Sequence, residues 1–162
     1  MPAVGGGNLP DFGQAYRKAA DYCAAQDRCI SEVKLKIRSW DIDSEFFDQI
    51  ITQLIDEGFL DEKRLAENYA SGKLRMKVSG KLKIAAGLRA RSIPASLIQQ
   101  ALASIDQEEY TLFLSSLLRK KLIQLGGNSV AEQQKAAYFA ASRGFESGLI
   151  ALHLHDSELF DL

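Results

Sequence analysis

The sequence predicts an all-α protein built as an elongated array of three tandem three-helix repeats. Apolar residues recur at helical spacing almost throughout the 162 residues, and the three prolines, at positions 2, 10 and 94, lie outside helix interiors. Sliding the sequence along itself by 51 residues, and then by a further 52, aligns three segments. Each segment contains a helix, a short corner and a second apolar helix, and one further helix precedes it.

Helix periods and end signals predict nine helices in order. Their expected ranges are 11–25, 29–40, 43–57, 61–77, 79–91, 94–104, 106–125, 129–144 and 146–155. Capping boxes are expected where an N-cap residue is followed three positions later by Glu or Gln, because each side chain can then bond a free backbone amide of the other. The pairs are Asp11 with Gln14, Asp106 with Glu109, and Ser129 with Glu132.

The alignment of the three segments places apolar residues in six shared columns, one of which is the corner itself. The columns are Val33/Ile84/Ala136, Ile37/Leu88/Ala140, Ile42/Ile93/Phe145 at the corner, Phe46/Leu97/Leu149, Phe47/Ile98/Ile150 and Ile51/Leu102/Leu154. One such unit is small for independent stability, so we expect the three to stack and to offer a concave side to a large partner.

A helix-to-helix corner is predicted between the third and fourth helices. Gly58 can adopt the left-handed conformation that ends a helix, and Asp61 can cap the next one. Leu60 and Leu65 stand where a hydrophobic staple would close, with Phe59 as the expected buried residue of the corner.

These elements predict a domain organisation. We expect a flexible N-terminal arm at 1–10, repeats at 11–58, 59–104 and 105–156, and a C-terminal tail at 157–162. Glycines at 5, 6 and 7 disfavour an ordered arm. The sequence contains neither an export signal nor an apolar run long enough to cross a bilayer, so we expect a cytoplasmic, monomeric protein without membrane contact.

Charge is segregated along the chain although the net charge is only −1. Between 41 and 68 nine acids face two cations, whereas between 72 and 91 seven cations occur with no acid. Like charges held together favour an anionic partner, either phosphates or an acidic protein surface. A solvated helix face is the simpler alternative.

We find no catalytic or metal-binding constellation. His153 and His155 are two residues apart and diverge on a helix, and Cys23 and Cys29 match no redox or zinc spacing. We therefore expect no enzymatic activity, no metal and no cofactor, and two reduced cysteines that serve as small buried side chains.

The segment from Gly58 to Arg75 resembles the central signature of RecX regulatory proteins. Residues matching it are Gly58, Leu60, Asp61, Arg64, Ala66, Glu67, Tyr69 and Arg75. Further resemblance covers Arg28–Ile37, Gly80–Ile84 with Leu88 and Ile93, Leu118–Lys121, and Tyr138 through Arg143, Gly144 and Phe145. The chain departs from the family pattern at Cys29, Gly87, Ser92 and Ala140.

The resemblance implies a non-enzymatic regulator that binds the RecA–single-stranded DNA filament and inhibits or limits RecA activity in recombination, repair and damage signalling. Direct contact with single- or double-stranded DNA is a further implication. We expect the partner-binding surface to comprise Arg64, Tyr69, Lys73, Arg75, Lys77, Lys81, Lys83, Arg89 and Arg91. Two alternatives stay open: a helical nucleic-acid-binding module, which the pI of about 6.1 disfavours, and a repeat scaffold for another protein.

Overall fold

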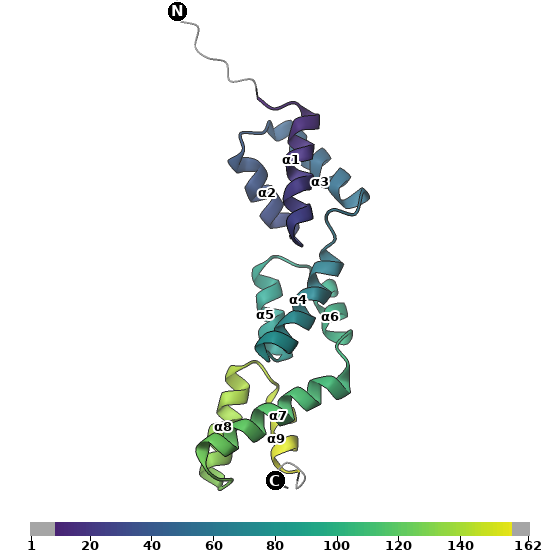
Figure 1. Ribbon diagram of the computed structural model, residues 1–162. Helices are drawn as coiled ribbons and strands as arrows, with labels where there is room; N and C mark the ends of the chain where they lie inside the picture. The colour runs from purple at the N-terminus through teal and green to yellow at the C-terminus, as the bar shows by residue number, and fades with distance from the viewer. Residues whose placement is uncertain (1–8, 157–162) are drawn as a thin grey trace, which may run out of the picture. The chain divides into compact units, whose positions relative to one another are not determined.

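A computed structural model describes residues 9–156, and every regular element among them is a helix (Figure 1). The predicted all-α class is confirmed. No helix within this range is both long and apolar enough to span a bilayer. The elements are α1 (Phe12–Ala25), α2 (Ile30–Ser39), the 3-10 helix η1 (Ser44–Phe46), α3 (Phe47–Asp56), α4 (Glu62–Lys77), α5 (Lys81–Ala90), α6 (Ala95–Ala103), α7 (Gln107–Leu125), α8 (Val130–Ser142) and α9 (Ser147–Leu154).

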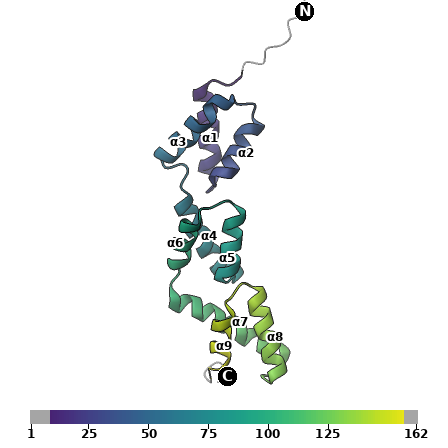
Figure 2. The ribbon, with the colours of Figure 1, turned by 180° about the vertical axis from the view of Figure 1, so that it is seen from behind.

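The helices follow one another in groups of three, α1–α3, α4–α6 and α7–α9, as Figure 1 and the reverse view in Figure 2 show. Contacts divide the chain into two compact units, one ending at Leu65 and the other beginning at Ala66, so the division falls inside α4. The residue limits of the three repeats stay a prediction. The predicted tail and residues 1–8 of the predicted arm lie outside the described residues.

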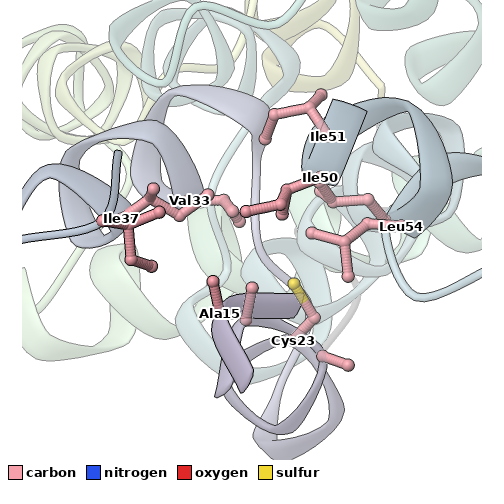
Figure 3. Close-up of a cluster of buried hydrophobic side chains, with 11 residues drawn as sticks. Ala15, Cys23, Val33, Ile37, Ile50, Ile51 and Leu54 are labelled. Atoms are coloured by element: carbon pink, nitrogen blue, oxygen red, sulfur yellow. The ribbon is translucent and has the colours of Figure 1, made fainter. Parts of the chain in front are cut away.

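The core of the first unit is formed by α1, α2 and α3 (Figure 3). Val33 and Ile37 of α2 meet the apolar face of α3, where Ile50 and Leu54 are fully buried. The residues of α1 that are buried in this core have small side chains, and these allow the helices to approach closely. They are Ala15, Ala19, Ala20 and Cys23. Cys23 and Cys29 are both free and buried, in agreement with their predicted role. Burial raises the pKa of the Cys23 thiol.

The three predicted corners share one backbone conformation. In each corner, a residue with positive φ directly precedes a buried apolar residue. The residue before the positive-φ residue donates its backbone amide to the carbonyl of the residue three positions earlier in the helix. The left-handed residues are Asp41 (φ 55°), Ser92 (φ 60°) and Gly144 (φ 93°), followed by Ile42, Ile93 and Phe145. The amide-to-carbonyl pairs are Trp40 to Ile37, Arg91 to Leu88 and Arg143 to Ala140, at 3.2, 3.1 and 3.1 Å. The repeat alignment therefore corresponds to repeated geometry.

The corner between α3 and α4 is confirmed, with one correction. Gly58 has φ 79°, and Leu60 and Leu65 are 2% and 3% exposed, as a closed staple requires. The expectation that Phe59 is the buried residue is wrong, because Phe59 is only half-buried. The amides of Phe59 and Leu60 both donate to the carbonyl of Leu54, and this fold-back over the end of α3 brings Leu60 into the core.

Helix starts follow the capping signals only in part. Asp11 and Gln14 form the full capping box of α1. Asp106 accepts from the amide of Glu109 at 2.8 Å, but both carboxylate oxygens of Glu109 accept from Arg75. The third helix starts later than expected, after the 3-10 turn η1.

The N-cap residue of α2, Cys29, has no side-chain oxygen, and carboxylates of two other residues accept hydrogen bonds from the free backbone amides at this helix start. Glu32 accepts from the amide of Cys29 at 3.1 Å. Glu62, on the first turn of α4, accepts from the amide of Ile30 at 3.3 Å, so a residue 32 positions away closes the helix end. Burial raises the pKa of Glu62, while this hydrogen bond and Lys34 oppose that change.

We predict that Ser92→Gly stabilises the protein by about 0.5–1 kcal/mol. A side chain in the left-handed region costs about 1–2 kcal/mol, and the greater freedom of glycine in the unfolded chain offsets part of that gain. Thermal unfolding followed by circular dichroism measures the effect. Ser96→Gly, in the first turn of α6, is the matched control and should lower the melting temperature. Equal destabilisation by both changes would contradict the strain at Ser92.

Candidate partner-binding surface

Tyr69 of α4 is the centre of a small aromatic and cationic cluster. The Nζ atom of Lys73, one turn later, lies 5.4 Å from the ring centroid, and the guanidinium carbon of Arg91 lies 4.8 Å from it. A Cβ atom at Gly87 would lie 2.1 Å from the Tyr69 hydroxyl oxygen. The absence of a side chain at position 87 therefore lets the ring rest against α5, with the cations of two elements over it.

Two of the predicted contact residues have intramolecular partners in the second unit. Arg75 donates from Nε and Nη2 to Glu109 at 2.7 and 3.1 Å, a two-point contact that joins α4 to α7. This hydrogen bond lowers the pKa of Glu109 and raises that of Arg75. The Nζ atom of Lys81 lies 4.9 Å from the Tyr110 ring centroid. Both cations thus link α7 to the α4–α5 segment.

Arg64 belongs to the first unit and is engaged there. Its Nε atom lies 3.1 Å from the Asp27 carboxylate, and its Nη1 donates to the carbonyl of Gly58 at 3.2 Å. Both side chains stay partly exposed, so the ion pair contributes about 1 kcal/mol or less. Arg64 therefore helps to hold the corner that Gly58 forms.

The remaining predicted cations, Lys77, Lys83 and Arg89, are exposed on α4 and α5. Large apolar side chains lie among them: Met76 is 84% exposed and Leu82 is 57% exposed. This part of the chain therefore presents exposed cations and exposed apolar side chains together.

The start of α5 is docked on the last repeat corner through backbone hydrogen bonds. The amide of Gly80 donates to the carbonyl of Arg143 at 2.8 Å, and the amide of Leu82 donates to the carbonyl of Gly144 at 3.0 Å. The first-turn amides of a helix have no partner within the helix, so the corner carbonyls satisfy them. A Cβ atom on Gly80 would lie 2.3 Å from the Gly144 carbonyl carbon, so the contact requires glycine at position 80.

Tyr110 completes this junction from α7. Its fully buried hydroxyl accepts from the amide of Lys81 at 3.0 Å and donates to Glu146 at 2.6 Å. Burial, and then the hydrogen bond to Glu146, hold the pKa of Tyr110 well above its ordinary value. The guanidinium of Arg143 also donates to the carbonyl of Lys77. One residue cluster thus closes the ends of α4, α5 and α8.

The sequence does not predict this junction, although some of its residues belong to the motifs described above. Gly80 and Gly144 were noted as motif residues, but no sequence signal pairs them across 64 positions. The nine predicted contact residues divide into the Tyr69 cluster with Lys73 and Arg91, three engaged cations and three exposed cations. Their role in partner binding stays a prediction.

Comparison with known proteins finds a family model, described as RecX, second three-helix domain, that matches residues 61–102. Regulatory protein RecX of Chlorobaculum tepidum is 28% identical over 116 residues, covering 72% of this chain and 71% of that protein. Regulatory protein RecX of Prosthecochloris aestuarii is 24% identical, covering 86% and 91%. The chain spans only 56% of the Lactococcus lactis SK11 relative, at 26% identity.

Solved structures agree with these relatives. The crystal structure of RecX from Lactobacillus salivarius matches with a TM-score of 0.85 at 25% identity, covering 94% of this chain and 98% of that one. A second crystal structure, of a regulatory protein RecX, matches with a TM-score of 0.76 at 22% identity and shows the shared fold alone. The tandem three-helix organisation is therefore shared with solved proteins.

We predict that Gly80→Ala destabilises the protein by about 3 kcal/mol or more. The new methyl group would meet backbone atoms of Gly144 and Phe145, which cannot rotate away as a side chain can. Urea unfolding measures the loss. Gly72→Ala is the control, because its Cβ atom would meet nothing within 4 Å inside α4, and it should stabilise by about 1 kcal/mol. A Gly80→Ala protein with unchanged stability would show that α5 does not dock on the corner.

We predict that Tyr110→Phe costs about 1–3 kcal/mol at neutral pH, because the amide of Lys81 and the carboxylate of Glu146 lose a buried hydrogen-bond partner. The pKa of Tyr110 is raised above 10.0, so its stabilisation is present below that pH and is lost as pH rises through the raised value. Urea unfolding at neutral and alkaline pH should therefore show that the free energy of unfolding falls less at alkaline pH in Tyr110→Phe than in the unchanged chain. Tyr138→Phe, at an 80% exposed tyrosine, should change neither the stability at neutral pH nor its decrease at alkaline pH.

Proposed function

Because the chain belongs to the RecX family of regulatory proteins, we propose that it regulates the RecA recombinase by binding the RecA–single-stranded DNA filament and limiting RecA activity. One observation carries the proposal to particular residues. All nine predicted contact residues fall within 61–102, the segment that matches the family's second three-helix domain. The partner itself is supplied by the family resemblance and not by the geometry.

The composition of this segment supports a protein partner over bare DNA. Lys77, Lys83 and Arg89 are exposed beside the exposed apolar side chains of Met76 and Leu82. Apolar contact gives a protein interface its fully buried centre, and the surrounding cations steer association and suppress wrong partners. A phosphate backbone would use the cations but would leave the apolar side chains without a role.

The engaged cations supply rigidity in this proposal. Arg75 and Lys81 are bound to α7 through Glu109 and Tyr110, so they fix α4 and α5 as a platform. The exposed cations then act as separate weak contacts, each contributing about 1 kcal/mol or less. Inhibition of RecA should therefore decline gradually with the number of charges reversed.

We predict that the triple variant Lys77→Glu, Lys83→Glu and Arg89→Glu inhibits RecA about 10- to 100-fold less well than the unchanged chain. Three contacts of about 1 kcal/mol each set this range. The measurement is the concentration that halves RecA-dependent ATP hydrolysis on single-stranded DNA. These three positions avoid the cations packed on Tyr69 and Tyr110, whose reversal would also disturb folding.

The matched control is Arg119→Glu, Lys120→Glu and Lys135→Glu, which changes the net charge equally at exposed positions of α7 and α8. It should inhibit almost as well as the unchanged chain. Full inhibition by the first triple variant would contradict the assigned surface. If the chain instead binds bare and RecA-coated DNA equally, a DNA-binding module is the better description. Recovery of a partner other than the recombinase would favour the scaffold alternative.

A further inference from the structure

An apolar groove lies between α8 and α9 of the second unit, where these two helices pack together. We call it the α8–α9 groove, and its volume is about 630 Å³. Its lining includes the buried side chains of Ile150 and Leu154 together with Val130 and Tyr138, which are 73% and 80% exposed. The small side chain of Ala137 leaves part of this space unfilled. Apolar surface that stays open to this extent marks a place where another segment binds.

The surroundings of the groove are cationic. A second hollow of about 520 Å³ lies between α7 and α8, and Gln134 and Tyr138 line both hollows. Lys121 and Lys135 also line this second hollow, and Lys135 lies one helical turn before Tyr138. None of the described residues that line either hollow is acidic. A complementary occupant therefore combines apolar side chains with acidic ones.

The chain has such a segment directly after the groove. His155 lines the groove, and the sequence from Ser157 to Leu162, outside the described residues, contains three apolar residues, two acids and no cation. We propose that residues 157–162 occupy the α8–α9 groove, with Phe160 and Leu162 in the apolar space and their acids near the two lysines. Residues two positions apart share one side of an extended segment, so Phe160 and Leu162 can enter together while Asp161 faces away.

Chain length and tethering favour this occupant over a separate molecule. Six extended residues reach about 20 Å, whereas α8 rises about 16 Å between Val130 and Ala141, the ends of its contribution to the groove. A segment tethered this closely has an effective concentration in the millimolar range. A contact too weak to hold a free peptide is then sufficient, and a partner segment of the same composition would have to displace residues 157–162 before it could bind.

Disulfide trapping in the full chain tests the occupant. The variant Ala137→Cys with Leu162→Cys replaces one groove residue and one residue of the segment, and cysteine is itself a small apolar side chain. The control is Leu152→Cys with Leu162→Cys, because Leu152 is 67% exposed on α9, does not line the groove and is closer to position 162 along the chain. Cys23 and Cys29 are buried and do not compete.

Under mild oxidation of dilute protein, the groove pair should form its intramolecular disulfide about tenfold faster than the control pair, since occupancy holds the two thiols together. Peptide mapping by mass spectrometry identifies the bond. Gln133→Cys with Leu162→Cys probes a second position of the lining. If neither groove pair reacts faster than the control pair, the assignment is overturned. Crosslinked dimers whose fraction rises with protein concentration would overturn it in favour of a second copy.

A charge-matched comparison tests the role of the lysines. Lys135→Glu in the trapping variant should slow disulfide formation about two- to fivefold, because one exposed charge contact is lost and a repulsive one is added. Lys120→Glu makes the same charge change at an exposed residue of α7 that lines neither hollow, and it should leave the rate nearly unchanged. Equal slowing by both changes would contradict the assigned contact.

A measurement without cysteines completes the test. In the full chain, Phe160→Ser with Leu162→Ser should empty the groove, so that the fluorescence of added anilinonaphthalene sulfonate rises and the melting temperature falls. Leu159→Ser, on the opposite side of an extended segment, should change both less. No change in the double variant, or equal changes in both, would refute the occupant. No recombinase enters these measurements, so failure here leaves the proposed RecA regulation standing.

Discussion

The structure depends on corners in which one left-handed residue precedes a buried apolar residue. Such a corner ends a helix, reverses the chain within two or three residues and buries the apolar side chain between the two helices that it joins. The requirement is conformational, and the chain meets it unequally. Gly144 adopts the left-handed region without steric cost, Asp41 tolerates it, and Ser92 is strained there. The repeats therefore share a backbone path more closely than they share residue types.

In the second unit, the corner between α8 and α9 also provides the docking site for the start of α5. Its carbonyls at Arg143 and Gly144 point at the free amides that begin α5, and Tyr110 closes the set with its hydroxyl. Because Gly80 and Gly144 lack side chains, the two backbones can approach directly. Helix ends that would otherwise need water are satisfied by a neighbouring repeat. This explains how units too small for independent stability can support one another.

The cations of the chain differ in the contacts that they make. Some hold the fold: Arg75 binds Glu109, Arg64 binds Asp27 and Arg143 binds the carbonyl of Lys77. Others stand over aromatic rings: Arg91 over Tyr69, and Lys36 over Tyr22 and Trp40. A third set is exposed beside apolar side chains. A basic stretch of sequence can therefore contain cations that hold the fold, cations that pack on aromatic rings and cations that stay exposed, and only their contacts in the structure distinguish them.

The sequence by itself determined the helical class, the nine α-helices of residues 9–156, the corner positions and the family resemblance, since these follow from local periodicity, capping and short motifs. It also placed the small cysteines in the core. It could not determine that Leu60 rather than Phe59 enters the core, that Glu62 closes α2, or that Gly80 meets Gly144. It likewise did not separate the engaged cations from the exposed ones. Those outcomes depend on contacts between residues tens of positions apart, and only tertiary structure decides which distant amide, ring or carboxylate a side chain meets.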